Sequence, residues 1–321
     1  MDILKVRDLK TYFKIKAGTV KAVDGVSFTL KEGESLGLVG ESGCGKTTIA
    51  LSITQLLPPE GLIAGGEIYF EGTNLLKLNE EEIRAKRWKD ISIIFQGAMN
   101  ALNPVMRVGD QISEACVYHE GMSYDSARKR VKELFSLVEI DESRIDDYPH
   151  EFSGGMKQRA VIAMALACGP KIVIGDEPTT ALDVMIQAQI LQLLNRLRKE
   201  MDMSMIIITH DLSILGETCD KVAVVYAGKI VEIGEVETIY EEHTHPYTEK
   251  LVKAFPNIFG KREMTASIPG MPPNLINPPA GCRFHPRCEH ATEKCRLVEP
   301  KLKLIGGEHY VACHLRGDND E

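Results

Sequence analysis

A glycine-rich turn between a short apolar run and a helical pattern constrains the fold of this chain more than any other feature. Residues 36–39 read LGLV, residues 40–47 read GESGCGKT, and a helical pattern runs from Lys46 to about Leu57. The turn fits G-x-x-x-x-G-K-[ST], in which glycines let backbone N–H groups turn inward around an anion. The positive end of the helix dipole points at the same place. The pattern predicts a phosphate-binding loop, with Lys46 facing the β- and γ-phosphates of a nucleotide and the Thr47 hydroxyl available to Mg²⁺.

Strand and helix patterns alternate along the rest of the first 250 residues. Residues 171–175 and 204–208 are short apolar runs that suit buried parallel strands, and residues 184–199 between them have helical periodicity. Strand, helix and strand at this spacing form the βαβ unit of a parallel sheet. Residues from about 100 to 167 show helical patterns and no strand run, so we expect an inserted helical subdomain. The predicted fold class is α/β with a mostly parallel sheet.

Composition and proline content indicate two parts and exclude several classes of protein. The chain has 321 residues, of which 44% are hydrophobic and 26% charged, as in ordinary globular proteins. Eight of its fifteen prolines lie between Pro256 and Pro300, where regular helix or inner strand cannot continue. We therefore expect one domain over residues 1–250 and a loop-rich extension over residues 251–321. The net charge of −8 argues against a general nucleic-acid binder, and the lack of an apolar run of 18 residues argues against a membrane span.

Two carboxylates follow one of the predicted buried strands. Asp176 and Glu177 come directly after the residues IVIG at 172–175. In open α/β sheets, the carboxyl ends of the strands form the edge at which ligands bind. Asp176 is suited to hold Mg²⁺ through water, and Glu177 is suited to take a proton from an attacking water. A positioned general base of this kind contributes about 10²–10⁴-fold to a rate.

Three further segments complete a set of nucleotide-site motifs. Gln96 follows the apolar residues 91–95, residues 152–159 read FSGGMKQR before an alanine-rich helix, and His210 lies in the THD at residues 209–211. Together with the phosphate loop and the acidic pair, these segments resemble the ABC-type ATPase family. Residues 152–159 match its signature motif, with Phe where Leu is commoner.

The resemblance narrows to one branch of that family. The chain contains LNP at residues 102–104, HPYT at residues 245–248 and PPAGCRFHPRC at residues 278–288. These segments are similar to those of the ATPase subunits of dipeptide and oligopeptide importers. The likeness extends from the first strand to about Leu315, which is nearly the whole chain.

The resemblance implies a role for each matching polar residue. Glu177 would be the catalytic base, His210 would contact the γ-phosphate, and Gln96 would contact Mg²⁺ and the attacking water. Asp176 and Thr47 would complete the Mg²⁺ shell.

Other residues would bind the nucleotide itself. An aromatic side chain near the N-terminus would stack on adenine; Phe13 aligns better than the adjacent Tyr12, and both are candidates. The residues implied to bind the phosphates are Gly40, Ser42, Gly43, Cys44, Gly45, Lys46, Thr47 and Thr48.

The same resemblance implies that two subunits share each ATP site. Ser153 and Gly155 would complete the site of the opposite subunit, and Asp183 would communicate across the dimer. ATP would hold two cassettes together and hydrolysis would release them, which would drive attached membrane subunits through a conformational cycle. The implied partners are a second ABC ATPase (identical or a paralogue), two transmembrane permease subunits and an extracellular or periplasmic substrate-binding protein. Nucleic acid is not expected as a partner. The chain would be peripheral, at the cytoplasmic face of the cell membrane.

Four of the eight cysteines lie in the extension, at Cys282, Cys288, Cys295 and Cys313. Structural zinc sites usually contain a close C-x₂₋₄-C pair, and this spacing has none. Four thiolates are the usual ligands of a [4Fe–4S] cluster, whose separate corners suit wider gaps. We therefore expect a structural [4Fe–4S] cluster, with Zn²⁺ and unligated or disulfide-forming thiols as the alternatives.

Two other functions compete with the energising ATPase of an importer. A soluble ABC ATPase could act on nucleic acid or ribosomes, but the chain has no room for long coiled coils and carries one cassette. An iron–sulfur redox sensor on a nucleotide-binding fold would not need Glu177 or the signature motif. The sequence therefore favours the importer ATPase, with peptides as the expected cargo and nickel or sugars as alternatives.

Overall fold

The computed structural model describes four stretches of the chain, which belong to two compact units. The described stretches are residues 1–97, 101–180, 182–254 and 268–315. The first unit contains residues 1–31, 35–76 and 209–321, and the second contains residues 32–34 and 77–208.

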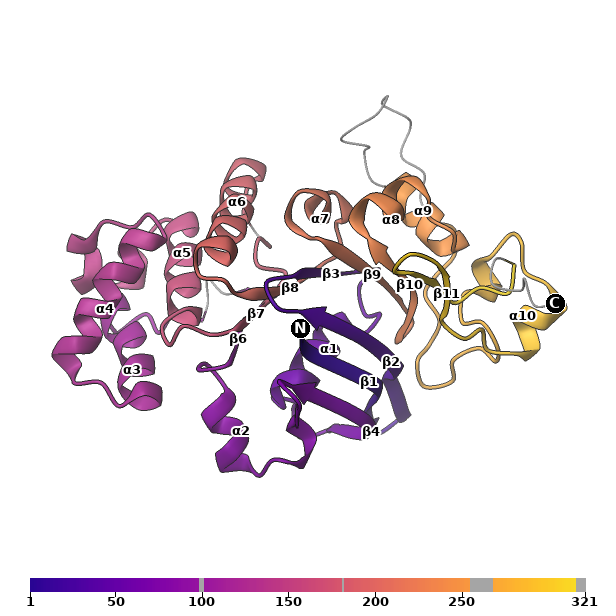
Figure 1. Cartoon of the computed structure of the whole chain (residues 1–321), viewed down its shortest axis with the longest axis horizontal. Helices are drawn as coiled ribbons and strands as arrows, with labels where there is room; N and C mark the ends of the chain where they lie inside the picture. Colours follow the sequence, from indigo (N-terminus) through magenta and orange to yellow (C-terminus); the bar gives the residue numbers. More distant parts are fainter. Residues whose placement is uncertain (98–100, 181, 255–267, 316–321) are drawn as a thin grey trace. The chain divides into compact units, whose positions relative to one another are not determined.

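An antiparallel sheet in the first unit contains the N-terminus (Figure 1). Its strands are β1 (Asp2–Ile15), β2 (Gly18–Lys31), β4 (Gly61–Phe70) and β5 (Thr73–Asn74), in the order β2-β1-β4-β5. Leu4 and Val6 of β1 are buried and pair with Leu30 and Phe28 of β2. Alternate residues of a strand face the same side, so this hairpin turns one apolar face inward.

The first unit also contains a mixed set of strands around the phosphate loop. Strand β3 (Ser35–Val39) pairs in parallel with β9 (Lys221–Tyr226), and β9 pairs antiparallel with β10 (Lys229–Glu235). Two short strands of the extension, β11 (Lys303–Gly306) and β12 (His309–Val311), continue from β10 in antiparallel fashion. The helices of this unit are α1 (Lys46–Thr54), α7 (Leu212–Thr218), α8 (Val236–Glu241), α9 (Pro246–Ala254) and α10 (Glu293–Leu297), with the 3₁₀ turn η5 (His285–Arg287).

The second unit combines three parallel strands with a group of helices. Strands β6 (Ile91–Ile94), β7 (Ile172–Asp176) and β8 (Ser204–Thr209) pair in parallel, in the order β6-β7-β8. Helix α6 (Val184–Glu200) connects β7 to β8, which confirms the predicted βαβ unit. The expected helical region lies between β6 and β7. Its helices are α3 (Val108–Glu120), α4 (Tyr124–Leu137) and α5 (Gly154–Ala165), with the short turns η3 (Glu142–Asp146) and η4 (Pro149–Glu151).

Short helical elements precede β6 in the chain. They are η1 (Leu75–Lys77) and α2 (Glu80–Lys86). Asn79 begins α2 with a capping box, in which its side chain accepts from the backbone of Glu82 while the Glu82 carboxylate accepts from the backbone of Asn79.

The buried face of helix α6 agrees with the face predicted from the spacing of its apolar residues. Ile190, Leu193, Leu194 and Leu197 are buried on one face, as their helical spacing predicts. The Asp183 carboxylate accepts from the backbone N–H of Ile186 at 3.0 Å and so caps the first turn.

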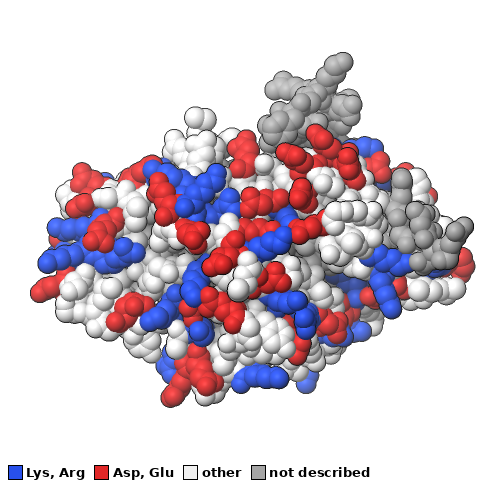
Figure 2. All heavy atoms as spheres, in the orientation of Figure 1, with Lys and Arg blue, Asp and Glu red and all other residues white. Residues whose placement is uncertain are grey.

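The described part of the chain contains no helix long and apolar enough to cross a membrane. On the face shown in Figure 2, acidic and basic side chains are interspersed.

Candidate nucleotide-binding site

The phosphate loop follows a fully buried strand and depends on glycine at two close approaches. Gly45 has φ of +109°, and a Cβ at this residue would lie 2.2 Å from the carbonyl oxygen of Ala22. A Cβ at Gly40 would lie 2.1 Å from the carbonyl oxygen of Val225. Real Cβ atoms do not approach oxygen so closely, so only glycine allows the loop to turn against β2 and β9. Helix α1 then begins at Lys46, and its first N–H groups are directed at the loop.

Lys46 is held inside the loop. Its side chain is buried, and Nζ donates to the carbonyl oxygens of Gly40 at 2.7 Å and Glu41 at 3.1 Å. The Cys44 thiol is also buried, which raises its pKa and keeps it in the unreactive neutral form. Ser42 and Thr47 are exposed on the loop.

The two N-terminal aromatic residues differ in their surroundings. Tyr12 and Phe13 are consecutive in β1, so their side chains leave opposite faces of the strand. The Tyr12 hydroxyl donates to Asp24 at 2.6 Å, and burial together with this contact raises the Tyr12 pKa to about 12. Phe13 is partly exposed and pairs with Gly61 of β4, where an added Cβ would lie 3.0 Å from its ring. Tyr12 is thus committed to a hydrogen bond, whereas the Phe13 ring has only apolar contacts to offer.

The acidic pair lies at the carboxyl end of β7, as predicted. Asp176 is the last residue of the strand and is only 1% exposed. Glu177 has a left-handed backbone with φ of +47°, and its N–H donates to the carbonyl oxygen of Ile208 at 2.9 Å. A non-glycine residue in this region is strained by about 1–3 kcal/mol, and such strain is often found where a side chain must be aimed.

The structure brings Gln96 and Glu177 together. The Gln96 amide donates to the Glu177 carboxylate at 2.8 Å, and the Thr180 hydroxyl donates to the same oxygen at 2.9 Å. Two donors on one oxygen fix the orientation of the carboxylate. Thr180 is a site residue that the sequence analysis missed, because a threonine three positions after a carboxylate gives no motif of its own.

The signature segment and Asp183 meet at two helix N-termini. Ser153 caps α5 and accepts from the backbone N–H of Met156 at 3.3 Å, while Asp183 caps α6. A Cβ at Gly155 would lie 3.1 Å from the Ile186 side chain, so the first turns of α5 and α6 are in contact. Both caps use backbone N–H groups, which leaves Ser153 and Asp183 exposed at their helix ends.

His210 lies on the turn that follows β8. It is exposed, and the next residue, Asp211, caps α7 by accepting from the backbone N–H of Ser213 at 2.9 Å. The backbone N–H of Asp211 donates to the Thr209 hydroxyl at 3.0 Å. The turn is therefore braced on both sides of His210.

Comparison with known proteins shows what this chain is similar to. The ABC transporter family matches residues 23–180, and the C-terminal region of oligopeptide/dipeptide transporters matches residues 231–295. The oligopeptide transport ATP-binding protein OppD of Bacillus subtilis is 49% identical over 96% of this chain and 87% of its own length. The dipeptide transport ATP-binding protein DppD of the same organism is 46% identical over 99% of this chain and 96% of its own length. This chain is an ABC transporter ATP-binding subunit of the oligopeptide/dipeptide family.

Solved structures agree with this assignment of the ATP-binding subunit. A dimeric ATP-binding cassette in a post-hydrolysis state with ADP and Pi has a TM-score of 0.65 and 28% identity, over 73% of this chain and 98% of that chain. CbiO1 of Clostridium perfringens, part of an ABC transporter complex, has a TM-score of 0.64 and 31% identity, over 75% of this chain and 92% of its own. The protein is therefore an ABC-type ATPase, and these relatives do not favour the soluble or redox-sensing alternatives.

The C-terminal extension of the ATP-binding subunit reaches its phosphate loop. Arg287 donates both terminal guanidinium nitrogens to the Glu41 carboxylate, at 2.6 and 3.0 Å. The hydroxyl of Tyr247 accepts from the backbone N–H of Glu41 at 3.0 Å. The segments that contain Arg287 and Tyr247 stand out in the sequence, but their contacts with the phosphate loop do not, because nothing local links residues so far apart.

The four cysteines of the extension line one small cavity. Cys282, Cys288, Cys295 and Cys313 share it with His245, His285 and His314. The backbone N–H of Cys282 donates to the carbonyl oxygen of Cys295 at 2.8 Å, and burial raises the pKa of the Cys282 thiol to about 11. None of the eight cysteines, all of which lie in the described stretches, forms a disulfide. Within the described residues, no group of three or more His, Cys, Asp or Glu side chains is arranged to hold a metal ion.

Proposed function

We propose that this ATP-binding subunit powers the import of dipeptides or oligopeptides. The observation that carries the catalytic part is the aimed Glu177 carboxylate at the end of β7, held by Gln96 and Thr180. The cargo is supported by the names of the relatives, which are oligopeptide and dipeptide transport proteins and match nearly the whole chain.

The residues divide the work of ATP hydrolysis between them. Lys46 neutralises charge on the β- and γ-phosphates, and the N–H groups of the loop and α1 donate to their oxygens. Glu177 takes a proton from the attacking water, while Gln96 orients both this carboxylate and the water. His210, on its braced turn, contacts the γ-phosphate.

The hydroxyl and carboxylate groups implied for the Mg²⁺ shell are of the kind that suits this ion. Thr47 is an exposed residue at the start of α1, and Asp176 is a buried carboxylate at a strand end. Such oxygens, with the Gln96 amide oxygen, are the ligands that Mg²⁺ prefers. When bound, Mg²⁺ neutralises charge that develops on the transferred phosphoryl group.

Phe13 is the better candidate to stack on adenine. Its ring is partly exposed and has no polar group to satisfy, whereas the Tyr12 hydroxyl is bound to Asp24. Stacking needs an accessible ring face, and Phe13 supplies one without breaking a hydrogen bond.

Two subunits form the complete sites. The exposed Ser153 and the partly buried Gly155 at the α5 N-terminus would reach the γ-phosphate on the opposite subunit, and Asp183 at the adjoining helix end would relay its state. The dimeric cassette with ADP and Pi supports this arrangement. The partners would be an identical or paralogous ATPase, two permease subunits and an extracellular or periplasmic substrate-binding protein, with this chain at the cytoplasmic face of the membrane.

The four cysteines of the extension would hold a [4Fe–4S] cluster. Four thiols around one cavity are the donor set of such a cluster, and all four belong to a segment with little core of its own. Zinc remains the alternative, although its structural sites usually contain a close C-x₂₋₄-C pair, which this spacing lacks. We expect anaerobically purified protein to absorb near 400 nm and the Cys288→Ser variant to lose this absorbance. A colourless protein that contains stoichiometric zinc would refute the cluster and favour a zinc site.

Glu177→Gln tests the catalytic assignment. We expect the variant to bind ATP, trap a closed dimer and lose hydrolysis by at least about 10²-fold, because the amide cannot accept the proton. Size-exclusion chromatography with ATP measures the dimer, and phosphate release measures the rate. The matched control is Glu133→Gln, an exposed residue of α4 that should behave as wild type. Normal hydrolysis by Glu177→Gln would remove Glu177 from its role.

A further inference from the structure

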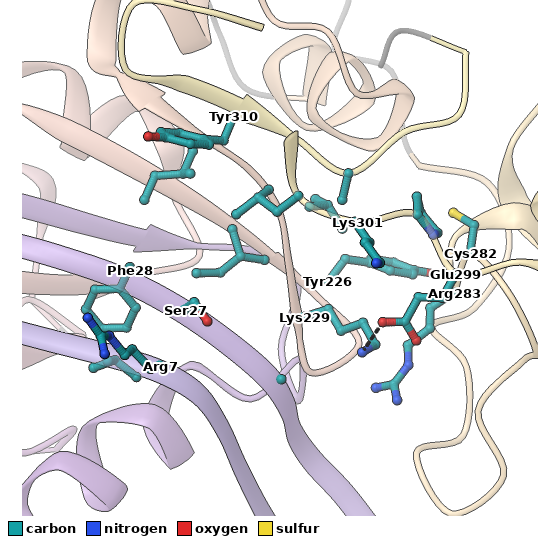
Figure 3. Close-up of a pocket in the computed structure, with 18 of the residues that line it drawn as sticks. Arg7, Ser27, Phe28, Tyr226, Lys229, Cys282, Arg283, Glu299, Lys301 and Tyr310 are labelled. Atoms are coloured by element: carbon teal, nitrogen blue, oxygen red, sulfur yellow. Dashed lines mark ion pairs between the residues drawn. The ribbon is translucent and has the colours of Figure 1, made fainter. Parts of the chain in front are cut away.

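A cavity of about 570 Å³ lies in the first unit, away from the residues assigned to ATP (Figure 3). Its walls come from the β1–β2 hairpin, from β9 and β10, and from residues 281–312 of the extension. This volume is in the range of sites for small organic ligands, about 300–1,000 Å³. The cavity therefore has room for a ligand of that class.

Apolar side chains form much of the cavity lining. Five apolar residues of the lining are buried: Val6, Phe28, Val231, Ile233 and Ala312. An apolar body placed against them would leave water, which is favourable by about 25 cal/mol per Å² of surface. The lining thus selects a ligand that is partly hydrophobic.

The charged side chains around this lining are mostly basic. Six are Lys or Arg, and two, Glu299 and Glu308, are acidic. Lys229 pairs with Glu299 at 2.7 Å, and Lys221 pairs with Glu308. Arg283 pairs with Asp24, so these three cations are already compensated.

Three cations of the cavity have no carboxylate partner within the described residues. They are Lys5 and Arg7 on the hairpin and Lys301 on the extension. Figure 3 shows Arg7 beside Phe28 on the hairpin wall and Lys301 on the wall that the extension forms. The Arg7 guanidinium lies 5.7 Å from the Tyr69 ring centre, and Glu67 lies opposite Arg7 on β4 without forming an ion pair with it.

We propose that this cavity binds an organic anion with an apolar body and a carboxylate or phosphate head group. The excess of three cations supplies the attraction for the head group, and the buried side chains receive the body. Because the walls belong to both the hairpin and the extension, a bound ligand would contact the two together.

The site also has a direct connection toward the nucleotide. Lys229 and Arg283 both line the cavity and both contact Asp24. Lys229 donates to the backbone carbonyl of Asp24, and Arg283 donates to its carboxylate. The same carboxylate accepts from the Tyr12 hydroxyl. Tyr12 precedes Phe13, the proposed adenine-stacking residue. The coupling rests on the proposed adenine-stacking role of Phe13: with that role, ligand and nucleotide each change the affinity of the other by the same factor.

Fluorescence titration with 8-anilinonaphthalene-1-sulfonate, an amphipathic anion, tests the site on the full chain. Saturating MgADP is present so that the nucleotide site is blocked. We expect saturable binding that Lys301→Glu weakens at least about tenfold, because a carboxylate then faces the anion. Lys129→Glu is the matched control: Lys129 is an exposed residue of α4 outside the cavity, and its reversal changes the net charge equally.

Uncharged N-phenyl-1-naphthylamine separates charge recognition from damage to the cavity. Its binding should be the same in wild type and Lys301→Glu. If both probes are lost, Lys5→Gln decides, since it removes one charge and adds none; it should weaken the anion alone. Non-saturable binding of the anionic probe, or equal affinities in all these variants, would overturn the proposal.

Competition identifies the head group. Displacement of the probe by decanoate assigns a carboxylate, displacement by phenyl phosphate assigns a phosphate, and displacement by neither rejects an anionic ligand. Calorimetric titration of MgADP with and without the probe then tests the coupling, which we expect to change the MgADP Kd about fivefold in wild type and not in Lys301→Glu. An unchanged Kd would reject the coupling while the fluorescence result still decides the site.

Discussion

Removal of the Arg287 guanidinium should weaken ATP binding through the charge that it leaves behind. The Arg287 side chain is 4% exposed and donates hydrogen bonds to both carboxylate oxygens of Glu41, the second residue of the phosphate loop. The Glu41 side chain is 25% exposed. Such bidentate pairs are the stronger class of charged hydrogen bond. Arg287→Met keeps most of the side-chain volume and removes the charge, so Glu41 becomes an uncompensated anion beside the loop.

The size of the effect follows from two estimates. Breaking a buried pair costs about 3–5 kcal/mol, but water reaches the partly exposed Glu41, so we expect about 1–3 kcal/mol of lost stability. Two unit charges about 8 Å apart repel by about 2 kcal/mol at an effective dielectric constant of 20. An unpaired Glu41 at about that distance from a phosphate would weaken nucleotide binding about 30-fold.

Calorimetric titration with a non-hydrolysable ATP analogue measures this effect in a double-mutant cycle. Arg287→Met should bind about 30-fold more weakly than wild type, and Glu41→Gln with Arg287→Met should recover most of the loss because the stranded charge is gone. Arg130→Met, which removes a pair with Glu133 on α4 at 3.2 Å, is the control and should bind as wild type. A double variant as weak as Arg287→Met alone would show that charge beside the loop is not the cause.

Two further changes probe the loop and the extension. Gly45→Ala should abolish nucleotide binding and lower Tm, because its Cβ would lie 2.2 Å from the Ala22 oxygen. The Cβ of Gly43→Ala would meet nothing within 4 Å, so this variant should cost only about 1–2 kcal/mol of backbone strain. Equal losses in the two variants would refute the steric explanation. Burial lowers the pKa of His245 to about 3. As the pH falls, this histidine is protonated in the unfolded chain before it is protonated in the folded one. Its contribution to the free energy of unfolding is therefore fully present above about pH 6.5 and falls by up to about 1.4 kcal/mol per pH unit between about pH 6.5 and pH 3. Urea unfolding across this range should show that slope in wild type and lose this contribution in His245→Gln; an equal slope in both would contradict the assignment.

Much of the nucleotide site could be predicted because its parts are local in sequence. The phosphate loop is one continuous segment, and Glu177 directly follows a strand whose apolar residues mark it as buried. The helical pattern of residues 126–138 likewise predicts α4, which the structure places at Tyr124–Leu137. In each case the side chains that define the pattern are a few residues apart, so hydrogen bonding along the backbone and burial of one face are visible in the sequence.

The contacts of the extension were beyond sequence reasoning. The proline-rich segment suggested loops, yet β11 and β12 continue the strand order from β10, and the backbone N–H of Ala312 donates to Val231 at 2.8 Å. These strands are only three and four residues long, too short for an alternating pattern to stand out.

The sequence by itself determined the α/β class, the phosphate loop and the order of the motifs around it, because each depends on residues that are neighbours along the chain. Only the tertiary structure decided that Arg287 binds Glu41, that four cysteines share a cavity, and that Lys5 and Lys301 face the same space. Such pairs are separated by as many as 296 positions, and they meet because burial of apolar faces packs the extension against the first unit's strands. That packing free energy is summed over many side chains, so no single stretch of sequence records it.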